Sequence, residues 1–105
     1  MRRGDAYELP SPRAPRGHEQ RGQRYGVVLQ ADSLLRLSTW IVAPTSTKAR
    51  SASFRPEIKI NGQTTRVLVE QIGAVAPERL GSSVGHLSVS ELRAVEEAAR
   101  LVLDL

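Results

Sequence analysis

The chain has 105 residues, of which 40% are apolar. That length suffices for one domain, residues 1–105, and is too short for two. No apolar run approaches the ~20 residues that a membrane-spanning helix needs. The absence of cysteine excludes disulfides, thiolate nucleophiles and cysteine-based metal sites. No apolar segment follows the basic N-terminus, so we expect no secretory signal and a cytoplasmic protein.

Arginine dominates the charge of the chain. Fifteen Lys and Arg against eleven Asp and Glu give a net charge of +4, and thirteen of the fifteen bases are Arg. The excess lies in residues 1–50, which hold nine bases and four acids. Because the planar guanidinium group suits phosphate, this balance is consistent with a polyanionic partner such as a nucleic acid.

Short strands alternate with polar connections through most of the chain. Each predicted strand is an alternating or β-branched apolar run that is bounded by proline, glycine or a polar cluster. The predicted strands cover residues 5–9, 25–30, 39–44, 54–60, 66–72 and 84–87. The second is apolar almost throughout, which favours a central position. Asn61-Gly62 predicts a tight turn that pairs the fourth and fifth strands antiparallel.

Helical signals are fewer. Residues 31–38 and 76–81 each have room for one helical turn. The last element is clearer, because Ser88 and Glu91 form a capping-box pattern before an apolar stripe at helical spacing. That stripe consists of Leu92, Val95, Ala99 and Val102. The sequence therefore predicts a helix from Val89 to about Leu103, covering a small, strongly curved sheet or open barrel.

Few residues are available for catalysis. There are two histidines and no H-E-x-x-H or D-x-D pattern, and no G-x-S-x-G nucleophile elbow stands between a strand and a helix, so we expect neither a metal nor a cofactor. Two segments remain: the basic loop of residues 16–24 before the second strand, and the hydroxyl cluster of residues 45–47 after the third. If these strands are neighbours, the two segments meet and can bind a phosphodiester. Alternatively, they are a solvated loop and a plain strand end.

Several segments, in this order along the chain, resemble the MazF/PemK (Kid) family of toxins, the mRNA interferases of type II toxin–antitoxin systems. The resemblance spans almost the whole chain. Its segments are residues 2–5, Gly17-His18-Glu19-Gln20 with Arg24, 27–30, 41–47, 69–72, 80–81, 85–88 and the terminal helix.

The resemblance implies a mainly β fold with α, a small SH3-like open barrel of the CcdB/MazF/PemK type with a C-terminal amphipathic helix. It implies a homodimer and a metal-independent endoribonuclease that cuts single-stranded RNA at short sequences, leaving 2′,3′-cyclic phosphate and 5′-hydroxyl ends. It also implies a cognate, MazE-like antitoxin whose extended C-terminal segment fills the RNA groove.

The resemblance places the family's catalytic arginine on Arg24, which would hold the scissile phosphate. An ungapped comparison places the catalytic threonine on Ser46, with Thr45 in an aliphatic position, whereas a one-residue gap places it on Thr45. We prefer Ser46. The residues expected to shape RNA binding are Arg16, His18, Glu19, Gln20, Arg21, Thr47 and Lys48.

Besides the serine at residue 46 in place of the family's threonine, the sequence departs from the family pattern at three places. Tyr25-Gly26 stands where the family has proline and an aliphatic residue, which predicts a looser entrance to the second strand. Gln30-Ala31-Asp32 lacks the middle asparagine of a Gln-Asn-Asp motif. His18 replaces a serine, and is either an additional acid or base or a solvent-facing loop residue.

Two other functions remain open. CcdB-like gyrase poisons share the barrel but depend on the end of the C-terminal helix, and here that end is Leu103-Asp104-Leu105 while the Arg24 loop is intact. A relative that has lost catalysis and only binds RNA or an antitoxin would explain the departures at residues 25, 26 and 46.

Overall fold

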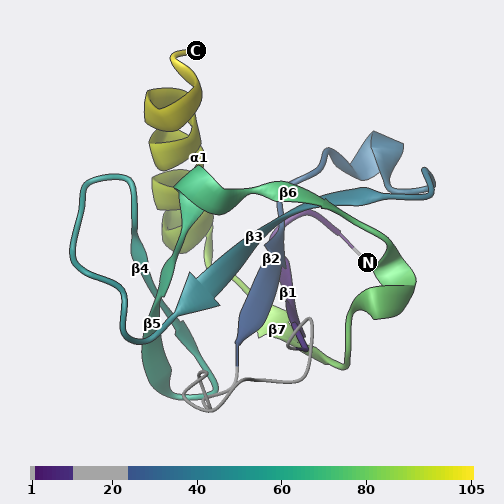
Figure 1. Ribbon diagram of the computed structural model, residues 1–105, viewed down its shortest axis with the longest axis horizontal. Helices are drawn as coiled ribbons and strands as arrows, with labels where there is room; N and C mark the ends of the chain where they lie inside the picture. Colours follow the sequence, from purple (N-terminus) through teal and green to yellow (C-terminus); the bar gives the residue numbers. More distant parts are fainter. Residues whose placement is uncertain (1, 11–23) are drawn as a thin grey trace, which may run out of the picture.

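The computed structural model describes residues 2–10 and 24–105. Within them, seven short strands precede one helix (Figure 1). The strands are β1 (Asp5–Glu8), β2 (Tyr25–Val28), β3 (Trp40–Ser46), β4 (Glu57–Ile60), β5 (Gln63–Val67), β6 (Gly73–Val75) and β7 (Ser83–His86). Three 3₁₀ turns, η1 (Asp32–Leu34), η2 (Val69–Gln71) and η3 (Pro77–Arg79), lie between them, and α1 spans Val89–Leu103.

The strands form one curled antiparallel sheet in the order β4-β5-β3-β2-β1-β7, with β6 pairing to the first half of β3. β2 is an inner strand, and all four of its residues are buried, as its apolar sequence predicts. The predicted fold, mainly β with a C-terminal helix on a half-open barrel, is therefore confirmed. No helix in the described ranges is long and apolar enough to cross a bilayer.

The main core lies between the concave face of the sheet and α1. Val95 and Ala98 of α1 are buried there against strand residues such as Val27 and Ile58, and Leu92, Ala99 and Val102 pack at its border. The helix begins as predicted, because the Ser88 hydroxyl accepts the Glu91 N–H and the Glu91 carboxylate accepts the Ser88 N–H.

A second, smaller cluster packs on the opposite face of the sheet. It consists of Tyr7, Val28, Trp40 and Val42. Successive strand residues point to opposite faces, so β2 sends Tyr25 and Val27 into the main core and Val28 into this cluster.

Two predicted strand ends around the β3–β4 connection are wrong. β3 continues through Pro44 to Ser46, because the Pro44 carbonyl still accepts the Leu68 N–H at 2.8 Å and β5 pairs with the last two residues. β4 begins at Glu57 and not at Phe54, because a turn in which the Arg55 N–H bonds the Ala52 carbonyl occupies the preceding residues.

The predicted strand over residues 66–72 is also wrong. β5 begins at Gln63, directly after Asn61 and Gly62, whose positive φ angles form the predicted hairpin turn. After Val67 the chain turns into η2, which buries both Leu68 and Val69. A continued strand would point these neighbours to opposite faces. The three-residue strand β6 was not predicted, because Gly73-Ala74-Val75 carries no periodic apolar signal.

Gly26 is required by close packing and does not loosen the strand. A Cβ at this position would lie 2.6 Å from Cγ1 of Val42, a buried, β-branched side chain that would have to shift. We expect Gly26→Ala to lower the free energy of unfolding by about 1–3 kcal/mol. Urea unfolding measures this. Gly73→Ala is the matched control, because a Cβ there meets nothing within 4 Å and should change stability by less than about 0.5 kcal/mol. Equal stabilities for the two variants would contradict the packing argument.

Candidate active site

The start of β2 and the end of β3 lie side by side. The register pairs Gly26 with Pro44 and Val27 with Ala43, so Arg24, directly before β2, and Ser46, at the end of β3, occupy the same end of the sheet. The sequence predicts that residues 16–24 and 45–47 meet if the two strands are neighbours. The strands are neighbours, and of the first segment the structure describes Arg24. Arg24 precedes β2 and Ser46 ends β3.

Arg24 and Ser46 lie on the same face of the sheet. Ala43 belongs to the main core, so alternation along β3 puts Thr45 on the core side and Ser46 on the opposite face, with Pro44. Tyr25 likewise points into the main core, which turns Arg24 toward the outer face. Pro44 and Arg24 line one cavity on that face.

The hydroxyl of Thr45 has a structural role. Thr45 is only 1% exposed, and its Oγ1 accepts the Tyr25 N–H at 3.1 Å. Its carbonyl accepts the Nε–H of Arg24 at 3.2 Å, which orients the guanidinium. Ser46 is half-buried, and its Oγ accepts the Lys48 N–H at 3.2 Å. Of the two candidate hydroxyls, that of Ser46 lies on the face with Arg24.

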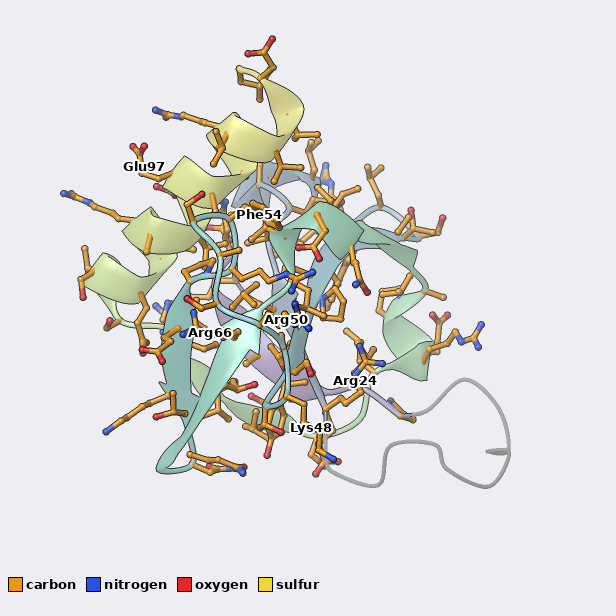
Figure 2. All side chains as sticks on the ribbon, turned by 60° about the vertical axis from the view of Figure 1, so that its left-hand side comes forward. Arg24, Lys48, Arg50, Phe54, Arg66 and Glu97 are labelled. Carbon is orange, nitrogen blue, oxygen red and sulfur yellow. The ribbon has the colours of Figure 1, made fainter. Side chains whose placement is uncertain are left out.

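Further polar and cationic groups follow Ser46 along the chain. Thr47 and Lys48 are exposed in the turn after β3, and so is Arg50. Figure 2 shows Arg24 and Lys48 at the same end of the molecule, away from α1. The remaining predicted RNA-binding residues lie outside the described residues: Arg16, His18, Glu19, Gln20 and Arg21.

Ion pairs hold the far end of the β3–β4 connection. The guanidinium of Arg55 donates to Oε2 of Glu70 from Nε at 3.1 Å and from Nη2 at 2.6 Å. Arg66 donates to the Arg55 carbonyl at 2.9 Å and to Glu57 at 3.2 Å. The connection that carries Lys48 and Arg50 is therefore fixed to β5 and η2 at the end where it returns to the sheet.

A side-chain hydrogen bond joins β1 to β7. Nδ1 of His86 lies 2.6 Å from Oδ1 of Asp5. Burial opposes ionisation of Asp5, but hydrogen bonds from His86 and the Arg2 N–H outweigh it and lower the pKa of its carboxyl. The hydrogen bonds from Arg55 lower the pKa of Glu70 against a smaller opposing effect of burial.

The lowered pKa values of Asp5 and Glu70 predict that the folded protein loses stability in acid. Carboxyls with a lowered pKa in the folded state stabilise the fold above their unfolded pKa values, about 3.9 for Asp and 4.3 for Glu, and this stability is lost as the pH falls through the folded values. We expect the urea midpoint to decline below about pH 4, and to decline less steeply in Asp5→Asn. Parallel pH profiles for the two proteins would contradict the contribution of Asp5.

A cavity of about 520 Å³ opens beside Arg24. Its polar lining comes from Arg24, Gln71 and Arg79, and the rest is apolar, contributed by Pro44, the residues that follow β1 and the segment from β6 to η3. No sequence pattern pointed to Arg79. It stands 55 positions after Arg24 in a short 3₁₀ turn, and only the fold brings the two arginines to one cavity.

The fold and this site define a small half-barrel protein with a cationic cavity and a hydroxyl at one end of its sheet. The family of PemK-like, MazF-like toxins of type II toxin–antitoxin systems matches residues 2–103. The chain belongs to this family, as the sequence resemblance predicted.

Individual relatives agree with this assignment. The chain is 41% identical to "Putative toxin Rv3098A/RVBD_3098A" of Mycobacterium tuberculosis over 98% of its length and 97% of that protein. It is 32% identical to "Endoribonuclease MazF9" of the same organism, over 100% of this chain and 98% of the relative. A solved mycobacterial endoribonuclease in complex with its cognate antitoxin has the same fold, with a TM-score of 0.81 at 16% identity, covering 100% of this chain and 96% of that one.

Proposed function

We propose that the chain is a single-domain endoribonuclease toxin, residues 1–105, that cuts single-stranded RNA at short sequences in the cytoplasm without a metal ion. The observation that carries the proposal is the placement of Arg24 and Ser46 on one face at one end of the sheet, beside a cationic cavity. Membership of a toxin family that includes a protein named as an endoribonuclease supports it.

The proposed reaction uses the RNA's own 2′-hydroxyl. Its oxygen attacks the adjacent phosphorus, the bond to the 5′-oxygen breaks, and the products are a 2′,3′-cyclic phosphate and a 5′-hydroxyl. The attacking hydroxyl loses one proton and the leaving oxygen gains one, so the reaction neither releases nor consumes a proton overall. Negative charge builds on the phosphate oxygens meanwhile, and a preorganised guanidinium stabilises that charge.

Arg24 and Ser46 have different roles in this reaction. The Thr45 carbonyl occupies the Nε–H of Arg24, which leaves the Nη groups to donate to the scissile phosphate. The Ser46 hydroxyl already accepts the Lys48 N–H, and its own proton is available to a phosphate oxygen. Lys48 and Arg50 add positive charge that attracts the RNA backbone.

Two protein partners belong to the proposal. One is a cognate, MazE-like antitoxin whose extended C-terminal segment occupies the RNA groove; the mycobacterial structure that contains a cognate antitoxin supports it. The other is a second copy of this chain. Leu34, Leu37 and Ile41 are large, exposed apolar side chains. Hydrogen bonds join their backbones, because Gln30 bonds the Leu34 carbonyl and the Ile41 N–H, and the Leu37 N–H bonds the Leu34 carbonyl. Such exposed apolar side chains favour association.

Incubation of the purified protein with a long single-stranded RNA in EDTA tests the proposal. We expect discrete fragments that carry 2′,3′-cyclic phosphate and 5′-hydroxyl ends. Intact RNA in the presence of a folded protein would contradict it, and would favour a gyrase-directed toxin or a relative that binds RNA without cutting it.

A further inference from the structure

The cavity beside Arg24 contains a second arginine that the proposed reaction does not use. Arg79 ends η3 and is exposed on the cavity wall. No residue of the described ranges accepts a hydrogen bond from its guanidinium or forms an ion pair with it. By contrast, Glu96, Glu70 and Glu57 hold the guanidinium groups of Arg3, Arg55 and Arg66, respectively.

The backbone that carries Arg79 is well fixed. The Arg79 N–H bonds the Ala76 carbonyl at 2.9 Å, and the Leu80 N–H bonds the Pro77 carbonyl at 3.0 Å. The next residue, Gly81, donates to the Glu8 carbonyl at 2.8 Å, which attaches this turn to β1. The side chain therefore extends from a rigid base, as a residue that selects a ligand requires.

The size and lining of the cavity suit one nucleotide. Its volume of about 520 Å³ is within the usual range for small-ligand sites. Pro44, Val75 and Ala76 provide apolar surface against which the face of a base can lie. Because Arg24 lies in the same cavity, a base held there belongs to a nucleotide next to the phosphate that Arg24 binds.

Arg79 favours one kind of base edge. A guanidinium only donates, and its two parallel N–H groups match two adjacent acceptors. Among the purines, guanine presents such a pair in O6 and N7, whereas adenine replaces O6 with an amino donor. Unpaired bases in single-stranded RNA expose these edges to protein side chains.

We propose that this cavity binds a guanine base adjacent to the scissile phosphate and that Arg79 is the specificity-determining residue. This inference rests on the proposed endoribonuclease function. It concerns which RNA is cut and leaves the bond-breaking step to Arg24 and Ser46.

Mapping of cleavage sites over a long RNA of random sequence tests the inference. We expect the wild-type protein to favour guanine at one position next to the cut. In Arg79→Ala, that preference should fall by about 5–150-fold, the range expected for loss of one bidentate base contact. Arg79→Lys should not restore it, because an ammonium lacks the planar fork. Arg93→Ala removes another exposed charge, on α1, across the molecule from η3 in Figure 1, and should leave the preference unchanged.

Several outcomes would overturn the inference. One is the absence of guanine preference in the wild type, and another is an unchanged preference in Arg79→Ala. A uniform loss of cleavage at all sites that lysine restores would make Arg79 a phosphate contact instead. Failure of the wild type to cut any RNA would overturn the proposed function itself, and the wild-type lane of the same experiment distinguishes this case from the others.

Discussion

Replacement of Arg24 by alanine is expected to lower the rate of RNA cleavage by about 10²–10³-fold, the loss typical of removing one preorganised donor from a charged transition state. The side chain is half-buried, and its Nε–H bonds the Thr45 carbonyl near the end of β3. Loss of this single bond should cost about 0.5–1.5 kcal/mol of stability, so the variant should remain folded. Single-turnover cleavage of one short RNA measures the rate, and urea unfolding measures the stability.

Two controls separate the role of Arg24 from the effect of its charge. Arg93→Ala removes the same charge from α1 and should cleave at the wild-type rate. Arg24→Lys keeps the charge but loses the planar fork, so it should recover only part of the rate. Wild-type cleavage by Arg24→Ala would exclude Arg24 from the reaction, whatever the family resemblance implies.

The fold was predictable where local signals were strong. The capping box at Ser88 and the apolar stripe after it predicted α1 with the correct bounds. Asn61-Gly62 predicted the hairpin, since positive φ is required at both positions. The errors fall where tertiary contacts override local preference. Pro44 stays within β3 because its carbonyl is bonded by Leu68, a residue 24 positions later, and no local pattern reveals that contact.

The site was predictable only in part, for similar reasons. The positions of the basic loop and the hydroxyl cluster at strand ends indicated the two segments, and the family resemblance then singled out Arg24 and Ser46 within them. The neighbouring strands place both residues at one end of the sheet. The second arginine of the cavity was not found, because Arg79 lies in a short turn with no motif around it. The ambiguity between Thr45 and Ser46 arises because adjacent hydroxyls look equivalent in sequence. In a strand they face opposite sides of the sheet.

Thr45 and Ser46 should therefore respond in opposite ways to loss of the hydroxyl. We expect Ser46→Ala to lower the cleavage rate by about 10²-fold, because the phosphate loses a positioned donor, with little change in stability. Thr45→Val keeps the shape of the side chain but leaves the buried Tyr25 N–H without its acceptor. Thr45→Val should lower the free energy of unfolding by about 1–3 kcal/mol and affect the rate much less.

The rates can be compared only when both variants are folded. Both should therefore be assayed at a urea concentration well below the midpoint of unfolding. Ser46→Thr provides the conservative control, because it retains the hydroxyl and should cleave at close to the wild-type rate. A large loss of rate in folded Thr45→Val, together with normal cleavage by Ser46→Ala, would assign the reaction to Thr45. That result would require the end of β3 to change conformation when RNA binds, because Thr45 is only 1% exposed in this structure and its hydroxyl faces the core.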